Sequence, residues 1–149
     1  MKKLLLLLLI IPLLFTSCTN DKNQKVYLSD KYYNEGVYID VVSSDLDKLK
    51  DDTYLLNIYN QFCNFKIPCE KIFLETMTKY KIDVLSMGID EYKKTSYFNE
   101  VRYAPSIIVI SKGKVLAYLD ANKDEDLNKY QDSDEFESWL SEHIYLEKK

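Results

Sequence analysis

Apolar positions of two different periods follow one another along this chain. Val37 to Val42 is β-branched and loosely alternating, Tyr54 to Tyr59 is a nearly continuous apolar run, and Ile82 to Ile89 is a third such stretch. Loose alternation predicts a strand with one buried face, whereas a continuous run predicts a strand covered on both faces. We therefore expect three strands in this part of the chain.

Stretches of helical period lie between these strands. Cys69 to Tyr80 carries four apolar residues that fall on one side of a helix. They are Ile72, Phe73, Met77 and Tyr80. A shorter helix is expected at Ser43 or Ser44, either of which is placed to cap it while Asp47 completes a capping box. Tyr92 to Asn99 favours one or two further helical turns.

The last third of the chain begins with a hairpin pattern. Pro105 to Ile110 and Lys114 to Leu119 are two apolar runs separated by Ser111-Lys112-Gly113, which is hairpin spacing. Asp132 and Glu135 then form a capping-box pair ahead of an amphipathic closing helix. The resulting order, β-α-β-α-β-α-β-β-α, places parallel crossovers before an antiparallel hairpin. The predicted fold class is α/β, with a mixed central sheet and helices on both faces.

The charge balance narrows the classes of function. The 149 residues carry 20 basic and 24 acidic side chains, which gives a formal net charge of −4 at pH 7, and no basic stripe interrupts the acidic excess. Nucleic-acid binding depends on clustered positive charge. We therefore expect no nucleic-acid partner.

The first residues of the chain have the pattern of an export signal. Lys2 and Lys3 precede an apolar core of twelve residues, Leu4 to Phe15, whereas a helix that spans a membrane needs about 20. This pattern is typical of a cleaved secretory signal. Export would place the mature protein where a disulfide can persist.

Phe15-Thr16-Ser17-Cys18 resembles a bacterial lipobox, although Phe15 stands where leucine is usual. The resemblance implies that Cys18 is lipidated and becomes the new N-terminus; the alternative is an ordinary signal peptide with a chance cysteine. We expect a signal peptide over residues 1–17, a tether over 18–30 and one domain over 31–149. The expected location is the bacterial cell envelope, outside the cytoplasm, with the membrane contacted through lipidated Cys18.

Cys63 and Cys69 are the candidate chemical groups, because they flank the junction between an expected strand and an expected helix. A helix N-terminus favours a thiolate through its unpaired N–H groups and its dipole. His143, the only histidine, is remote from both cysteines in sequence, which argues against a zinc site. The acidic run Asp124-Glu125-Asp126 is interpreted as a solvated helix start, since it lacks the spacing of a calcium loop. We expect neither a metal nor a cofactor.

The run from Val101 to Val115 reads V-R-Y-A-P-S-I-I-V-I-S-K-G-K-V. It resembles, without a gap, the thioredoxin segment I-R-G-I-P-T-L-L-L-F-K-N-G-E-V. Phe62-Cys63 resembles the W-C that opens the thioredoxin active site, and Pro68-Cys69 resembles the P-C that closes it. The likeness covers roughly Val37 to Ile144. It implies a thioredoxin-like fold and thiol–disulfide oxidoreductase activity.

The resemblance also implies roles for individual residues. In that family the proline that matches Pro105 is cis and faces the thiols, so Phe62, Ala104 and Pro105 are expected to shape a groove for an extended substrate. Cys63 would attack the substrate and Cys69 would resolve the mixed disulfide. The expected partner is an exported polypeptide or a redox partner protein.

The spacing of the thiols departs from the family pattern. Five residues separate Cys63 from Cys69, where the family has two. Residues six apart lie about 9 Å apart along a helix axis, whereas a disulfide requires Cα atoms within about 7 Å. The intervening segment must therefore fold back as a loop. Ile67 favours this, because a residue before proline is displaced from helical geometry, and Pro68 suits the first helical position.

Asn57 is a second departure, because it stands where the family has a buried acid and its amide cannot titrate. The simpler interpretation is a hydrogen-bonded polar residue in a strand. Two functions therefore stay open: a redox-active thiol pair, or a thioredoxin-fold binding or export accessory module whose disulfide only contributes about 2 kcal/mol of stability. Tyr59 and Tyr103 are candidates for lining a peptide-binding surface in either case.

Overall fold

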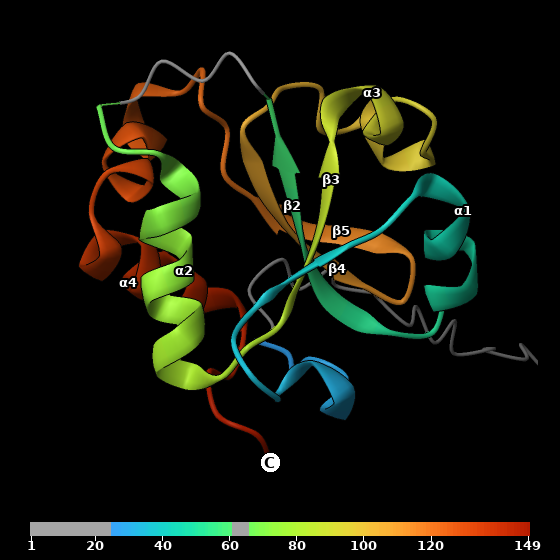
Figure 1. Cartoon of the computed structure of the whole chain (residues 1–149), viewed down its shortest axis with the longest axis horizontal. Helices are drawn as coiled ribbons and strands as arrows, with labels where there is room; N and C mark the ends of the chain where they lie inside the picture. The colour runs from blue at the N-terminus through green and yellow to red at the C-terminus, as the bar shows by residue number, and fades with distance from the viewer. Residues whose placement is uncertain (1–24, 61–65) are drawn as a thin grey trace, which may run out of the picture.

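The computed structural model describes residues 25–60 and 66–149, which form a five-stranded sheet in the order β1-β3-β2-β4-β5 (Figure 1). The strands are β1 Tyr38–Asp40, β2 Thr53–Tyr59, β3 Val84–Gly88, β4 Ser106–Ser111 and β5 Lys114–Tyr118. β3 pairs in parallel with both β1 and β2, while β4 pairs antiparallel with β2 and β5. This mixed sheet, built from parallel crossovers and a closing hairpin, confirms the thioredoxin-like α/β fold class.

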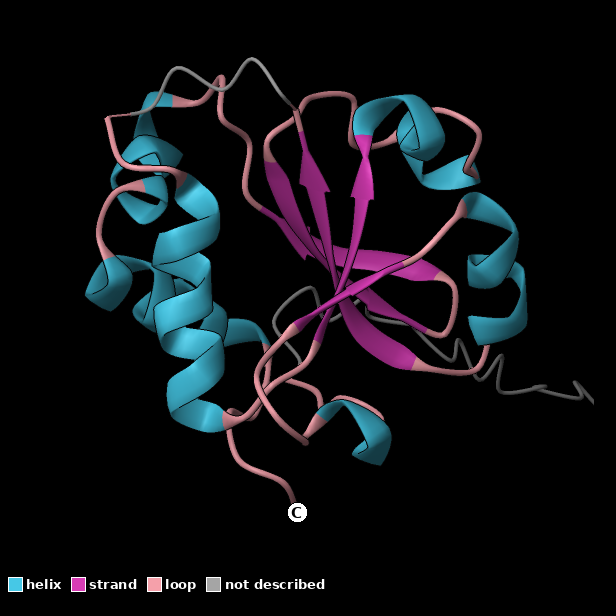
Figure 2. Ribbon diagram, in the orientation of Figure 1, coloured by secondary structure: helices cyan, strands magenta, loops and turns pink. Residues whose placement is uncertain are grey.

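Helices cover both faces of the sheet (Figure 2). The α-helices are α1 Ser43–Leu46, α2 Cys69–Tyr80, α3 Ile89–Tyr92 and α4 Ser133–His143, and the 3₁₀ helices are η1 Asp30–Tyr32, η2 Asp47–Leu49, η3 Ser96–Asn99 and η4 Asp124–Tyr130. α2 and α4 lie on one face, and α1 and α3 lie on the other. The bounds of α2 match the sequence prediction, because its buried positions repeat with helical period.

The central strand β2 is buried on both faces, as its continuous apolar run predicts. Successive side chains of a strand point to opposite faces, and the contacts of two tyrosines identify the helices that cover each face. The Tyr54 hydroxyl lies 3.4 Å from that of Tyr97, which belongs to η3 beside α3. On the other face, the Tyr38 hydroxyl donates to the Glu70 carbonyl in α2 at 3.1 Å. Asn57 pairs with Ser86, which in turn pairs with Asp40, so Asn57 shares the α2 face with Tyr38.

The start of α1 differs from the expected capping box. The N-cap is Val42 rather than Ser43 or Ser44, and the Val42 N–H donates to the Asp45 carboxylate at 3.3 Å. Valine has no side-chain acceptor, so only the carboxylate half of a capping box is formed. The expectation for Asp47 was wrong because the chain enters the helix one residue earlier than the serines suggest.

Residues 25–30, which the sequence assigned to a tether, pack on the domain. Val26 forms a parallel bridge with Ile144, and the Tyr145 N–H donates to the Val26 carbonyl at 2.9 Å. Leu28 is 2% exposed and belongs to the hydrophobic core. Cys18 and the expected signal lie outside the described residues. Within residues 25–60 and 66–149, no helix has the length and hydrophobicity needed to cross a membrane.

At the start of β3, the Asp83 carboxylate is bound by one short segment of chain. The amides of Glu35, Gly36 and Val37 donate to its Oδ1 at 3.1, 2.8 and 3.1 Å, and the Asn34 side chain donates to Oδ2 at 3.1 Å. Burial alone would raise the pKa of the Asp83 carboxyl, but these hydrogen bonds hold it below its ordinary value. Together these residues form the Asp83 cradle.

Gly36 is required in this cradle for two reasons. Its φ of +79° lies in the left-handed region, which side chains rarely adopt. A Cβ at this position would also approach the Met77 carbonyl oxygen of α2 to 2.6 Å. The backbone of the cradle is therefore in direct contact with the C-terminal part of α2.

Candidate thiol site

The first residue of α2 is Cys69, whose side chain is fully buried. Pro68 is the N-cap, with φ −55° and ψ 121°, so the expectation that it would be the first helical residue was off by one position. The Lys71 N–H donates to the Pro68 carbonyl at 3.0 Å. Cys69 therefore lies in the first turn of α2, where the N–H groups and dipole of a helix favour negative charge.

The second part of the site is the start of β4. The Ala104–Pro105 peptide bond is cis, as the resemblance implied, and Pro105 is buried while Ala104 is half-buried. The hydroxyl of Ser106 donates to the Leu119 carbonyl at 2.7 Å. This bond fixes the start of β4 against the end of β5.

Tyr130, the last residue of η4, connects these two parts. Its hydroxyl donates to the Pro105 carbonyl at 3.0 Å, and the same phenol interacts electrostatically with Cys69. Its ring lies 5.6 Å from that of Phe73, one turn beyond Cys69 in α2. Burial, with smaller contributions from Cys69 and nearby carboxylates, raises the pKa of Tyr130, so the phenol stays protonated and acts as a donor. Sequence reasoning missed Tyr130, although a lone aromatic in an otherwise polar segment was a usable signal.

A second neutral phenol contacts the first turn of α2. Tyr38 of β1 donates its hydroxyl proton to the Glu70 carbonyl, next to Cys69 in the first turn of α2. Burial raises the pKa of Tyr38, and interactions with Glu70 and Cys69 raise it further. Two segments remote in sequence, β1 and η4, thus supply protonated phenols to the surroundings of Cys69.

Asn57 is 1% exposed and lies on the α2 face of the sheet. Its side-chain amide donates to the Ser86 hydroxyl at 3.2 Å, while its Oδ1 has no hydrogen-bond partner among the described residues. The interpretation of Asn57 as a hydrogen-bonded strand residue holds for its amino group only. No proton can be gained or lost at this amide near neutral pH.

The remaining candidates divide between described and undescribed residues. Cys63 and Phe62 lie outside the described part of the chain. Tyr59 ends β2 and Tyr103 precedes β4, and these two strands pair antiparallel, so both side chains lie at the same end of the sheet. They are 37% and 55% exposed, which leaves aromatic surface available beside Pro105.

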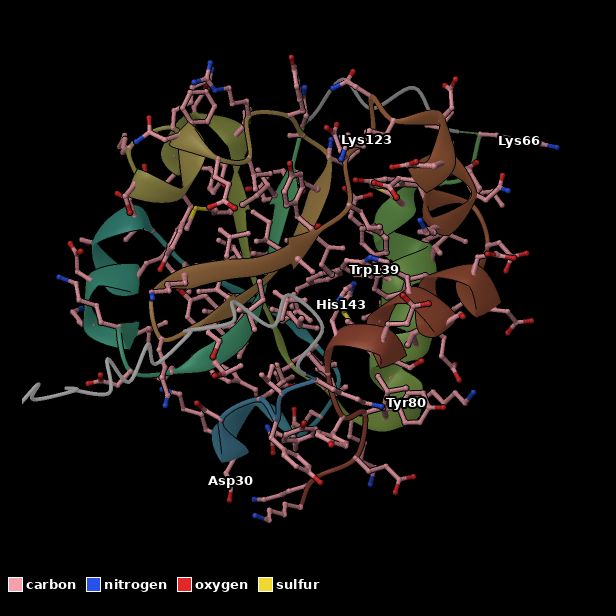
Figure 3. The ribbon with its side chains drawn as sticks, turned by 180° about the vertical axis from the view of Figure 1, so that it is seen from behind. Asp30, Lys66, Tyr80, Lys123, Trp139 and His143 are labelled. Carbon is pink, nitrogen blue, oxygen red and sulfur yellow. The ribbon has the colours of Figure 1, made fainter. Side chains whose placement is uncertain are left out.

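Two other groups singled out in the sequence take no part in this site. His143 is the last residue of α4 (Figure 3). The centroid of its ring lies 5.1 Å from that of Trp139, and the two rings pack in a T-shaped arrangement. Asp126 is 7% exposed, accepts from the Asp120 N–H at 3.0 Å and pairs with Lys129 at 2.7 Å. The solvated helix start expected at Asp124-Glu125-Asp126 was therefore wrong for Asp126. The described residues contain no cluster of three or more side chains suited to hold a metal ion.

Comparison with known proteins finds no matching family model and no matching curated protein. Solved structures of thioredoxins do match. A thioredoxin mutant from Halobacterium salinarum has a TM-score of 0.48 and 19% identity, over 72% of this chain and 94% of the other. Thioredoxin NaTrxh from Nicotiana alata has a TM-score of 0.45 and 19% identity, over 64% of this chain and 90% of the other. A Fasciola hepatica thioredoxin has a TM-score of 0.45 and 16% identity, over 80% of this chain and 99% of the other. The fold class itself rests on the strand order and pairing described above.

Proposed function

We propose that this protein is a thiol–disulfide oxidoreductase that acts on exported polypeptides through Cys63 and Cys69, held to the outer face of a bacterial membrane by lipidated Cys18. One observation carries the proposal. Tyr130 donates to the Pro105 carbonyl at 3.0 Å, and its ring lies 5.6 Å from that of Phe73, one turn after Cys69, so the helix turn that begins at a buried thiol and a strand-starting proline 36 residues away in sequence share one partner. A thiol at a helix N-terminus beside a strand end is a suitable place for disulfide exchange.

In the proposed reaction, the Cys63 thiolate attacks one sulfur of a substrate disulfide. The substrate S–S bond breaks, a Cys63–substrate disulfide forms, and the other substrate sulfur leaves as a thiolate that takes up a proton. The Cys69 thiol then loses its proton and attacks the Cys63 sulfur, which releases the second substrate thiolate and closes the Cys63–Cys69 disulfide. Two electrons pass to the substrate, and an external dithiol regenerates the protein by the same two exchanges.

The groove for the substrate would lie at the end of the sheet that carries Tyr59 and Tyr103. We propose that Phe62, Ala104 and Pro105 contact an extended substrate beside Cys63. Exposed tyrosines offer apolar area together with a polar hydroxyl, which suits contact with a polypeptide of varied sequence. The residues proposed to line this groove are all uncharged, so they would not restrict the substrate to one sign of charge.

A second candidate function is a binding or export accessory module whose disulfide is structural. The full burial of Cys69 and the neutral Asn57 favour it, because a buried thiol is less accessible and an amide cannot carry protons. The two candidates differ in the reduction potential of the thiol pair. Titration of the full chain against glutathione buffers should give a potential above about −250 mV for an exchanging pair and below about −300 mV for a structural clamp.

The direct test is reduction of insulin with dithiothreitol as the electron donor. The wild-type chain should accelerate the reaction, and Cys63→Ser should reduce the rate to the uncatalysed background, because the attacking sulfur is gone. Cys69→Ser should instead accumulate a mixed disulfide with the substrate, visible as a mass adduct. Unchanged activity of Cys63→Ser would exclude it as the nucleophile.

A further inference from the structure

A pocket of about 450 Å³ lies on the face of the sheet that carries α1 and α3 (Figure 1). Residues of α1 and η2 line one side, residues 94–97 line the other side, and the turn between β4 and β5 contributes Lys112 and Gly113. Pockets that bind small molecules commonly have volumes of roughly 300–1,000 Å³. Since α2 covers the opposite face of the sheet, this pocket is separate from the candidate thiol site.

The two sides of the pocket are joined by one carboxylate. Oε1 of Glu91 in α3 accepts from the backbone N–H of Ser43 in α1 at 2.9 Å and from the Ser43 hydroxyl at 2.6 Å. Hydrogen bonds from Lys94 and Ser43 lower the pKa of Glu91 to about 2. The carboxylate therefore stays ionised at neutral pH and connects α1 to α3.

The turn between β4 and β5 lies against the residues that follow η2. The Lys112 N–H donates to the Asp52 carbonyl at 2.9 Å, and a Cβ at Gly113 would lie 3.8 Å from the Lys50 carbonyl oxygen. The backbones of Lys50 and Lys112 are therefore neighbours, and both residues line the pocket.

The charged residues that line the pocket are mostly basic. Lys50, Lys94 and Lys112 line it, together with a single acid, Asp47. This local excess of positive charge is opposite in sign to the net charge of the chain, which is −4. A cleft lined by one sign of charge raises the local concentration of solutes of the opposite sign. The pocket is therefore suited to an anion.

Two of the three lysines are not closely paired within the protein. Among the described residues, Lys112 takes part in no ion pair. Lys50 lies 4.0 Å from Asp47, and the two side chains are 73% and 77% exposed, so their attraction is weak. Lys94 does have a close partner, because it pairs with Glu91 at 2.5 Å. The ammonium groups of Lys50 and Lys112 are therefore free to bind a ligand.

Hydroxyl groups add polar contacts on both sides of the pocket. Ser44 of α1 lines one side and Ser96 of η3 lines the other. Within the described part of the chain, neither hydroxyl makes a hydrogen bond. Ammonium groups and serine hydroxyls are the donors that proteins commonly offer to phosphate oxygens.

We propose that this pocket binds a small phosphomonoester whose phosphate contacts the three lysines and whose body carries hydroxyl groups. A phosphomonoester presents three terminal acceptor oxygens, whereas a carboxylate presents two. Three ammonium donors from three separate segments therefore suit the phosphate better. The volume leaves room beyond the phosphate for a body that hydrogen-bonds Ser44 and Ser96. This role goes beyond disulfide exchange and does not depend on it.

The test titrates glycerol 3-phosphate into the full chain at pH 7 and follows the amide chemical shifts. The wild-type chain should bind it with a dissociation constant of about 1 mM or below, and neither glycerol nor acetate should bind in that range. Lys112→Met removes an unpaired cation and should weaken binding about tenfold, as for the loss of one hydrogen bond to a charged group. Lys114→Met makes the same change on the same hairpin at a residue that does not line the pocket, so it should leave the affinity unchanged.

A second variant should increase the affinity, which a misfolded protein would not do. Asp47→Asn removes the acid that lines the pocket, and we expect glycerol 3-phosphate to bind about threefold more tightly. The matched control is Asp51→Asn, which makes the same charge change outside the lining. At an ionic strength of about 0.15 M, where longer-range interactions are screened, this control should keep the wild-type affinity.

The same phosphomonoester chemistry occurs in free molecules and in lipid headgroups. Vesicles of phosphatidylcholine with and without phosphatidic acid are therefore titrated with the wild-type chain and with Lys112→Met, which share the same residues 1–24. Binding of glycerol 3-phosphate that depends on Lys112 would assign a soluble ligand, whereas Lys112-dependent binding to phosphatidic acid vesicles alone would assign a headgroup. Equal losses of affinity in Lys112→Met and Lys114→Met, or no binding to either probe, would overturn the proposal and leave the thiol chemistry untouched.

Discussion

The two ends of the sheet are built in opposite ways. At one end, the Asp83 cradle takes all its donors from consecutive residues, Asn34 to Val37, and every one of them meets the same carboxylate. At the other end, Cys69 is surrounded by groups from α2, β1 and η4, and Asn57 on the same face keeps a buried oxygen without a partner among the described residues. A fully satisfied network stabilises one geometry. The thiol end is less completely satisfied, as functional sites often are.

The two ends of the sheet also differ in how close they lie to the ends of the described chain. In the described part of the chain, the first and last residues lie beside the cradle, and the N-terminus of α2 lies at the far end of the molecule (Figure 1). The N-terminal end of the described chain therefore lies at the opposite end of the domain from the first turn of α2.

The largest effect is expected from breaking the cradle. Asp83→Ala leaves three backbone amides and the Asn34 side chain without their acceptor, so we expect the free energy of unfolding to fall by about 3 kcal/mol. Asp83→Asn keeps one acceptor oxygen and should cost about half as much. Urea denaturation at pH 7 measures both. Insulin reduction by the folded fraction should be unchanged, and a large loss of activity in Asp83→Asn would show that the two ends are coupled.

Lowering the pH should weaken the stabilising contribution of the Asp83 cradle. The pKa of Asp83 is lower in the folded protein than in the unfolded chain, where it is about 4. Its contribution to stability is therefore complete above about pH 4 and is lost as the pH falls through the lower folded value. We expect the stability difference between wild type and Asp83→Asn to shrink between pH 5 and pH 2.5, as the Asp83 carboxylate takes up a proton. A difference that is constant with pH would mean that the carboxylate charge is not stabilising.

The smallest change in stability is expected at the thiol end. Tyr130→Phe keeps the ring against Phe73 but removes the hydroxyl that donates to the Pro105 carbonyl. We expect a loss of about 1 kcal/mol in unfolding free energy and roughly a tenfold slower insulin reduction. The matched control is Tyr33→Phe, which removes the hydroxyl that donates to the Tyr145 carbonyl near the cradle. Tyr33→Phe should lower the free energy of unfolding by a similar amount and leave the rate of insulin reduction unchanged. Equal rates of insulin reduction for Tyr33→Phe and Tyr130→Phe would refute a role for Tyr130 in exchange.

The sequence by itself determined the elements and their order. The helical period from Cys69 to Tyr80 defined α2, the continuous apolar run from Tyr54 to Tyr59 defined the central strand, and Asp132 was correctly identified as the N-cap of α4. Lys112 and Gly113 both have positive φ, as a two-residue hairpin turn requires. These features are local, because periodicity and capping depend on residues only a few positions apart.

Only the tertiary structure decided which side chains surround the thiol. Tyr130 and Gln131 reach the candidate site from η4, and Asp126 of that same helix is buried instead of solvated. Such contacts join residues tens of positions apart, and no periodic pattern marks them in advance. Packing of η4 between α2 and the start of β4 buries Tyr130 and Asp126, and a polar group removed from water must find a partner within the protein.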